Sequence, residues 1–341
     1  MRHMVTIAVL SATVCCMTIL CCGAEPGPTY EHIKFLEPMV GNWRVVTREG
    51  GKIVSDGQEA SEWILNKSFM RHTGWSQYEG KPSQYEFFTG WDPKTKKVFQ
   101  WAVGATDVGF GIMWREGTYD AAKRTWTARY RLELSDGGEE TSLVNLKIVD
   151  DSKITIDFTE RRLSGKPLAD LHDTFTRAAA VAAAPFDSTP GAGYEHLKFL
   201  DFSVGKWKLE AALPDGQYVG EELNAWVFDK NFIRTKGWGK IAGQERVDYE
   251  LLTGWDPAKK KVFMRFIGSD GSVALREGTY DAEKNCLKSK HTAVDASGVE
   301  SSSTVVEQYV NKDRFLLKFT DGMKGGKPQP DAEATVTRIS R

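Results

Sequence analysis

The stretch Thr89-Gly90-Trp91-Asp92-Pro93-Lys94-Thr95-Lys96-Lys97-Val98-Phe99 is repeated as Thr253-Gly254-Trp255-Asp256-Pro257-Ala258-Lys259-Lys260-Lys261-Val262-Phe263. In each copy an Asp-Pro step and polar residues lie between β-forming residues. This pattern predicts a hairpin turn, because proline presets φ and the aspartate side chain caps the turn backbone. One copy would indicate a local turn, whereas two copies indicate a duplicated module.

Further segments return in the same order, so the duplication covers most of the chain. Residues 30–36 (YEHIKFL) return as 194–200 (YEHLKFL), and 115–120 (REGTYD) return unchanged as 276–281. Single residues repeat as well: Trp43, Phe69, Arg71 and Trp75 return as Trp207, Phe232, Arg234 and Trp238. The framework is therefore shared, and the copies differ by loop-sized changes in length.

Length and composition fit two ordinary domains. The chain has 341 residues and is 41% hydrophobic, enough to bury two cores. Residues 178–193 are rich in Ala, Pro and Gly, which is typical of a linker. We therefore predict domains at residues 25–177 and 194–341.

The 45 basic and 46 acidic residues nearly balance, so we expect no nucleic acid partner.

Residues 1–24 are predicted to be a secretory signal. Arg2 and His3 precede an apolar run that ends in Cys22-Gly23-Ala24, small residues of the kind that a signal peptidase reads. We expect cleavage after Ala24 and a secreted or periplasmic protein with no membrane contact afterwards. Two alternatives stay open: an uncleaved anchor, because the apolar run approaches spanning length, and a lipoprotein modified at Cys21 or Cys22.

The cysteines give little covalent support to the fold. Four of them, Cys15, Cys16, Cys21 and Cys22, lie in the predicted signal, which leaves Cys286 in the mature chain. An exported protein with one thiol has no internal disulfide, so we expect its domains to be stable through packing alone.

Period-two segments dominate each module and predict an all-β fold. About ten strands are joined by hairpin-length turns, and helical spacing is confined to residues 30–36. An antiparallel meander of this kind removes its exposed edges by closing into a barrel. In the first module we predict strands at 43–48, 62–65, 69–77, 85–91, 98–103, 111–117, 125–134, 142–149, 153–159 and 171–177.

The order of these elements resembles the lipocalin and calycin families, in which a short helix precedes Gly-x-Trp and the last strand ends in arginine. The resemblance implies two tandem barrels, each with a tryptophan at its floor and an arginine over the indole face. These residues are Trp43 with Arg177 and Trp207 with Arg338. Such a cation–π contact is worth about 1–2 kcal/mol when it is partly desolvated.

Four elements in order, Gly-x-Trp, Gly-Trp-Asp-Pro, Glu-Gly-Thr-Tyr-Asp and a closing Phe-Thr-Arg or Val-Thr-Arg, are similar to a family of secreted bacterial domains of unknown function 1579. The resemblance covers both modules nearly end to end. It implies a calycin-like barrel and no particular activity.

Motifs of common catalytic sites are missing from the sequence. It has no Gly-x-Ser-x-Gly elbow, His-Glu-x-x-His helix, phosphate loop or Cys-x-x-Cys pair. The histidines His32, His72, His172, His196 and His291 are scattered without metal-ligand spacing. We therefore expect a non-catalytic protein with no metal site and no cofactor.

Arg71 and its repeat Arg234 are candidate ligand-binding residues. On a strand Arg71 shares a face with Phe69 and Trp75, which would turn it into the barrel, where a guanidinium binds a carboxylate or another anion. The alternative is structural, with Arg71 paired to Glu116 or Glu277, or lying near a barrel end.

Other candidates are aromatic. Trp101 and Trp114 have no tryptophan counterpart in the second module, and with Trp75 and Trp238 they could line an aromatic pocket; the alternative is that they are core or girdle residues. His172 lies in a segment, 171–177, that resembles the last strand of haem-binding nitrobindin-type barrels, which makes haem an alternative cofactor. Against haem, the apolar face of this strand predicts that His172 points outward.

The sequence thus favours an exported protein that binds a small, partly apolar and possibly anionic ligand in a barrel. One alternative is an interaction module with filled barrels, and another is a haem carrier or a calycin-like enzyme. The oligomeric state and the reactivity of Cys286 stay open.

Overall fold

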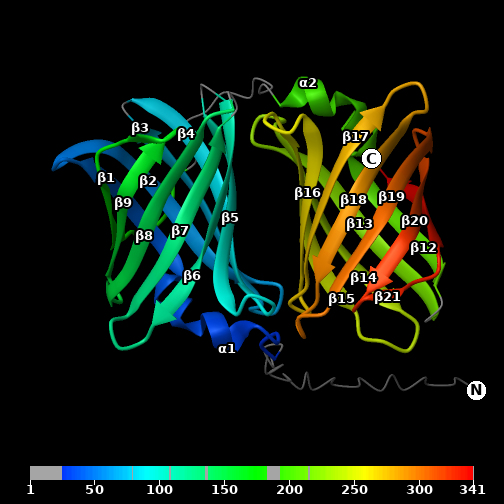
Figure 1. Ribbon diagram of the computed structural model, residues 1–341, viewed down its shortest axis with the longest axis horizontal. Coiled ribbons are helices and arrows are strands. Elements are labelled where there is room, and N and C mark those ends of the chain that lie inside the picture. The colour runs from blue at the N-terminus through cyan, green and yellow to red at the C-terminus, as the bar shows by residue number, and fades with distance from the viewer. Residues whose placement is uncertain are drawn as a thin grey trace, which may run out of the picture.

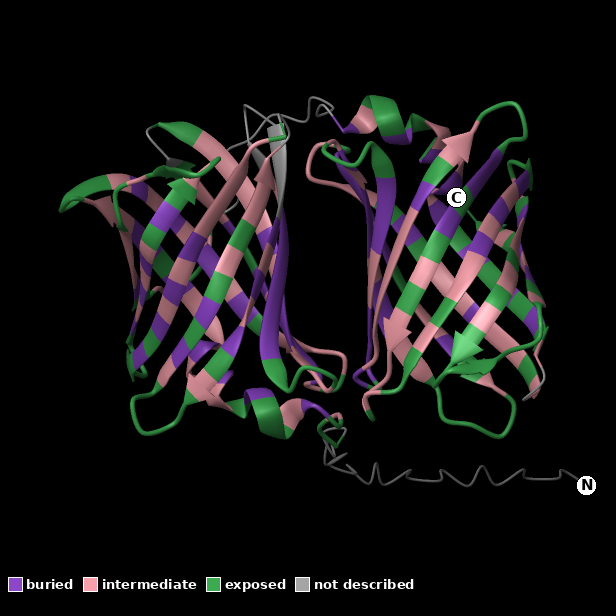
Figure 2. Cartoon of the chain, in the orientation of Figure 1, coloured by how far each residue is buried: buried purple, intermediate pink, exposed green. Residues whose placement is uncertain are grey.

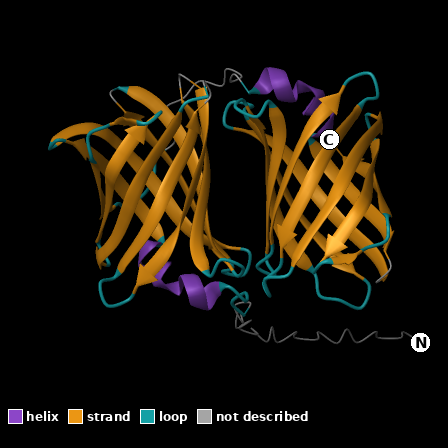
Figure 3. Ribbon diagram, in the orientation of Figure 1, coloured by secondary structure: helices purple, strands orange, loops and turns teal. Residues whose placement is uncertain are grey.

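The computed structural model describes residues 25–78, 80–106, 109–134, 137–182, 193–213 and 216–340. The predicted signal and most of the predicted linker lie outside these residues. The described part forms two closed antiparallel barrels of ten main strands, each preceded by a short helix, which confirms the predicted fold class. Figure 3 shows that the helices lie only at the barrel ends.

The first barrel starts with α1 (Tyr30–Ile33) and η1 (Lys34–Met39), as the helical spacing predicted. Its strands follow as a meander, and β8 pairs with β9 to close the ring. The strands are β1 (Gly41–Glu49), β2 (Lys52–Ile64), β3 (Phe69–Tyr78), β4 (Lys81–Asp92), β5 (Lys97–Thr106), β6 (Gly109–Asp120), β7 (Thr125–Leu134), β8 (Glu139–Asp150), β9 (Lys153–Leu163), β10 (Lys166–Pro167) and β11 (Leu171–Arg177).

The second barrel repeats this plan after α2 (Tyr194–Leu197) and η2 (Lys198–Ser203), and β19 pairs with β20 to close it. Its strands are β12 (Gly205–Leu213), β13 (Gly216–Val227), β14 (Phe232–Ile241), β15 (Val247–Asp256), β16 (Lys261–Gly268), β17 (Val273–Asp281), β18 (Cys286–Val294), β19 (Glu300–Asn311), β20 (Arg314–Lys324), β21 (Lys327–Pro328) and β22 (Ala332–Ser340).

The repeated Asp-Pro segment forms the predicted turn in both barrels. In the first, Asp92 ends β4 and its Oδ1 accepts a hydrogen bond from the Lys94 amide at 2.8 Å. In the second, Asp256 Oδ1 accepts one from the Lys259 amide at 3.0 Å. Aspartate therefore caps both turns.

Each barrel floor is closed as the family resemblance implied. The Arg177 guanidinium lies 4.0 Å from the Trp43 ring centroid, and that of Arg338 lies 4.2 Å from Trp207. Both indoles are fully buried. Arg177 also donates hydrogen bonds to the Pro38 and Val40 carbonyls, so it satisfies backbone acceptors at the end of η1.

The two barrels lie side by side in opposite orientations, with α1 and α2 at opposite ends of the molecule (Figure 1). The strands that face the other barrel contain long runs of buried residues (Figure 2). One apolar cluster spans both barrels and includes Phe69, Phe99, Phe232 and Phe263. The first pair and the second pair are repeats of each other, so the interface has approximate two-fold symmetry.

One predicted strand is much too short. Residues 62–65 were expected to form a strand, whereas β2 runs from Lys52 to Ile64 and Leu65 lies in the following turn with φ of 50°. The stretch from Lys52 to Ser61 is mostly polar, and pairing with β1 and β3 holds it in the sheet despite its low β propensity.

Candidate functional site

The first barrel encloses a cavity of about 630 Å³. It extends from Met39 at the floor to Ser83 and Leu134 at the opposite end. Most of its wall surface is apolar, and numerous polar side chains also line it; small-molecule sites likewise combine apolar walls with polar groups. The apolar wall includes Val45, Phe87, Ala102, Val103, Met113, Leu132, Leu146, Ile156, Phe158, Leu171 and Phe175, and the polar groups include Glu59, His72, Tyr85, Gln100, Arg115, Tyr130, Glu140, Arg161 and Asp173.

Arg115 is the central polar residue of this cavity. It is 6% exposed, and its guanidinium carbon lies 5.0 Å from the ring centroid of Phe158, 5.2 Å from Tyr130 and 5.9 Å from Phe87. Among the described residues it has no hydrogen-bond or ion-pair partner, and its buried Nε is unsatisfied. Burial lowers the pKa of Arg115, as expected for a desolvated cation.

Asp173 on β11 lines the same cavity. No cation within the described residues forms an ion pair with it, and its Oδ1 accepts no hydrogen bond. Burial raises the pKa of Asp173 to about 6, because a carboxylate loses hydration there.

A satisfied hydrogen-bond chain crosses another part of the wall. His72 Nδ1 lies 2.8 Å from Ser61 Oγ and 3.2 Å from Glu59 Oε1, and His72 Nε2 lies 3.1 Å from Thr89 Oγ1. Thr89 is 1% exposed and is not part of the cavity wall. The Thr89 hydroxyl is therefore out of reach of a bound molecule. This set of hydrogen bonds positions the His72 ring without presenting a nucleophile to the cavity.

A second arginine in the cavity, Arg161, is fully matched. It lies 3.0 Å from Glu140 and 3.3 Å from Glu49, and it donates to the Ala169 carbonyl at 2.5 Å. Arg115 therefore stands out as an unmatched cation in a cavity where the other arginine is neutralised.

The second barrel keeps the arginine and supplies its counter-charge. Arg276, the repeat of Arg115, lies 2.5 Å from Glu307 Oε1 and 3.2 Å from Ser289 Oγ. The strand registers place Leu146 and Ala128 at the matching positions of the first barrel. Both positions that bind the arginine in the second barrel are thus apolar in the first barrel.

Residues 27–176 match the family described as "Protein of unknown function (DUF1579)". The first barrel is a DUF1579 domain. No curated protein matches the chain. A solved protein of unknown function from the DUF3598 family of Nostoc punctiforme PCC 73102 aligns with 90% of this chain and 99% of its own at 9% identity, with a TM-score of 0.21.

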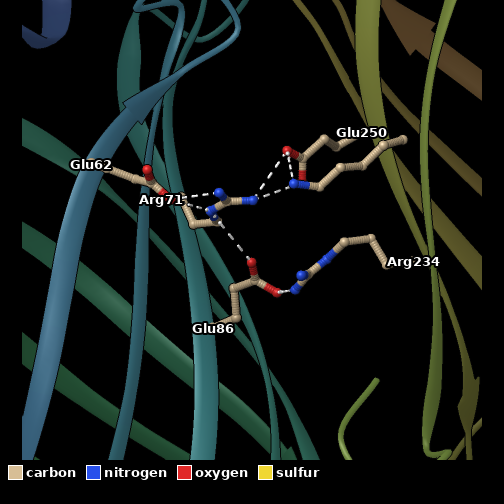
Figure 4. Close-up of polar contacts among 6 residues, drawn as sticks. Glu62, Arg71, Glu86, Arg234 and Glu250 are labelled. Carbon is tan, nitrogen blue, oxygen red and sulfur yellow. Dashed lines mark hydrogen bonds and ion pairs between the residues drawn. The ribbon is translucent and has the colours of Figure 1, made fainter. Parts of the chain in front are cut away.

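Arg71 does not enter the cavity of the DUF1579 domain, so the expectation that its strand face turns inward is wrong. It points to the second barrel, where Nη1 lies 3.1 Å from Glu250 Oε1, and it also lies 2.5 Å from Glu62. Arg234 makes the reciprocal ion pair with Glu86 (Figure 4). Glu116 and Glu277, the partners that the structural alternative named, pair instead with Lys97 and Lys259.

The candidate tryptophans also lie outside the cavity. Trp101 and Trp114 instead line a groove between the barrels, where the Arg265 guanidinium lies 5.7 Å and 5.4 Å from their ring centroids. Trp75 donates to the Ala182 carbonyl at 3.0 Å, and Trp238 lies under Arg246 at 4.7 Å.

His172 lies on the outer face of β11, with Nδ1 2.6 Å from Asp157 Oδ1, while its neighbour Asp173 faces the cavity. Cys286 is buried and free. The described residues contain no cluster of His, Cys, Asp or Glu able to hold a metal ion, and no helix of the length and hydrophobicity that a membrane span requires.

The sequence did contain a signal for Arg115. This residue opens the repeated REGTYD segment, and on a strand it shares a face with Met113 and Gly117. A charged residue in the middle of a strand, between apolar and small neighbours on its own face, indicates a buried polar position.

The ion pairs of Figure 4 are expected to stabilise the contact between barrels. Glu86 is fully buried between Arg71 and Arg234. Replacing it, Glu86→Ala, leaves Arg234 without its partner and should lower the free energy of unfolding by about 2–4 kcal/mol. Urea unfolding measures the change. The control Glu62→Ala removes an exposed partner of Arg71 and should cost less than about 1 kcal/mol; equal effects of the two variants would contradict the assignment.

Asp173 should make stability depend on pH. Its folded pKa of about 6 lies above the ordinary 3.8, so the folded chain holds the extra proton and loses stability as the pH rises from about 4 to about 6. Asp173→Asn should therefore raise the free energy of unfolding at pH 7 by about 1–3 kcal/mol and change it little at pH 4. Urea titrations at both pH values test this, with the exposed Asp170→Asn as control; a stability gain equal at both pH values would count against it.

Proposed function

We propose that the DUF1579 barrel binds a small, partly apolar organic anion, with Arg115 as the group that takes the negative charge. Three features support this. The cavity volume of about 630 Å³ lies within the range of small-molecule sites, its wall surface is largely apolar, and the guanidinium within it forms no ion pair with any described residue. A bound carboxylate would supply that counter-ion through charge-assisted hydrogen bonds.

The contrast between Arg115 and Arg276 carries the proposal. A buried charge without a partner is strongly unfavourable, by several kcal/mol. The second barrel avoids that cost because Glu307 lies 2.5 Å from Arg276. The first barrel retains the arginine next to Leu146, and a role in binding an anion explains why.

The binding is proposed to be non-catalytic and to need no cofactor. The hydrogen-bond chain through His72 is closed by Glu59, Ser61 and Thr89, and none of these hydroxyls faces the cavity. Export is also part of the proposal and is supported by the signal-like composition of residues 1–24. A second function, an interaction module with a filled interior, suits the second barrel, whose arginine is neutralised from within.

Arg115→Met should weaken binding of decanoate to the full chain by about 10–100-fold, because one charge-assisted interaction is lost. Isothermal titration calorimetry with decanoate measures the affinity. The matched control is Arg276→Met in the second barrel, which should leave the affinity unchanged. Loss of binding in the control alone, or in neither variant, would refute the assignment of Arg115.

Leu146→Glu tests the same site by adding a counter-charge instead of removing the cation. This change gives the first barrel the carboxylate that Glu307 provides in the second, so it should neutralise Arg115 and weaken decanoate binding about tenfold or more. Leu146→Gln controls for the loss of apolar surface and should have a smaller effect. Unchanged affinity in Leu146→Glu, with the fold intact by circular dichroism, would speak against a free guanidinium as the anion site.

A further inference from the structure

Arg115 and Asp173 are two opposite charges that face one cavity without pairing with each other. Arg115 comes from β6 and Asp173 from β11, and in the ring of strands these two are separated by β1–β5 on one side and β7–β9 on the other. They therefore project from nearly opposite walls. The separation exceeds that of an ion pair, because no contact within 4.0 Å links them.

The Asp173 carboxylate is only partly satisfied, because the Thr47 side chain hydrogen-bonds to it but no cation of the described residues forms an ion pair with it. The strand register places Asp173 opposite Thr47 on β1 and Ile156 on β9, and its Oδ1 is buried without a donor. Of the other two carboxylates of the cavity, Glu59 is held by Ser61 and His72, and Glu140 is paired with Arg161. Asp173 is thus the carboxylate of this cavity that is left without a donor at one oxygen.

The second barrel again shows the contrast. The strand registers place Ala334 at the position of Asp173, and both face the same way from the last long strand. Gln100, whose Oε1 is also buried without a donor, is matched by Met264. The first barrel therefore has two acceptors where the second has apolar side chains, in addition to the unmatched Arg115.

We infer that the ligand is an apolar acid that also carries a hydrogen-bond donor, a hydroxyl or an ammonium group, and that Asp173 receives this donor while Arg115 binds the acid group. The inference rests on the proposed function and adds the substrate class to it. A molecule lying across the lumen meets both walls at once, so its acid group and its donor reach side chains that do not reach each other. The apolar remainder packs against Phe158, Phe175 and Leu171.

The test compares three probes on the full chain by isothermal titration calorimetry: decanoate, 3-hydroxydecanoate and 3-aminodecanoate. The wild type should bind one of the substituted acids about tenfold more tightly than decanoate, because a hydrogen bond to a charged group is gained. Asp173→Ala, which copies the second barrel, should abolish this preference and leave decanoate affinity equal or higher. Asp157→Asn, on the outer face, should keep it.

A second variant distinguishes a hydroxyl donor from an ammonium donor, and it changes the side chain less than Asp173→Ala does. Asp173→Asn keeps an acceptor and removes the charge, so a preference for the hydroxyl acid should largely survive it, whereas a preference for the amino acid should be lost. Thermal unfolding confirms that each variant is folded.

The outcomes are distinguishable. Equal affinity for all three probes in the wild type, or a preference that persists in Asp173→Ala, would overturn the inference and leave the proposed function standing. Failure of all three probes to bind would overturn both.

Discussion

The shared face of the two barrels is the constraint on which the site depends. Strands β3 to β5 are covered on both sides, by the barrel core and by the second barrel, where Phe69, Phe88 and Trp101 join one apolar cluster. Because side chains alternate along a strand, burying Phe69 and Arg71 against the neighbour turns Met70 and His72 into the lumen. The position of the interface therefore decides which residues can meet a ligand.

Because the module is duplicated, the second barrel serves as an internal reference for interpreting the cavity of the first. Floor, turns and helices are nearly the same in both halves, so differences at matching positions reflect what each barrel does. Arg276 is neutralised by Glu307, and Ala334 stands at the position of Asp173. In the first barrel Arg115 has no ion-pair partner among the described residues, and Asp173 Oδ1 has no donor. Buried groups without partners lower stability, and such residues are typical of binding sites, where function and stability compete.

Much of the fold could be predicted from the sequence, and less of the site. The repeated Asp-Pro turn and the short helix follow from the local sequence, whereas the pair of Trp43 and Arg177 follows from the family resemblance. The start of β2 was missed because its polar residues pair through backbone hydrogen bonds alone. The sequence could not show whether the Arg71 side chain points into the barrel or out of it. The two-residue period shows that the faces of a strand alternate but not which face is inner, and both faces of β3 carry apolar residues. Its partner Glu250 lies in the other half of the chain.

The interface also explains why two modules belong in one chain. A first barrel alone would expose Phe69, Phe99 and Trp101 together with the buried carboxylate of Glu86, a combination that is unfavourable in water because it leaves a large apolar patch on a folded surface. The second barrel covers this patch with Phe232 and Phe263 and matches Glu86 with Arg234. The second barrel thus contributes to this interface through its outer face, while inside it Arg276 pairs with Glu307. The interface stabilises the folded chain, whereas the unpaired groups in the cavity of the first barrel lower its stability.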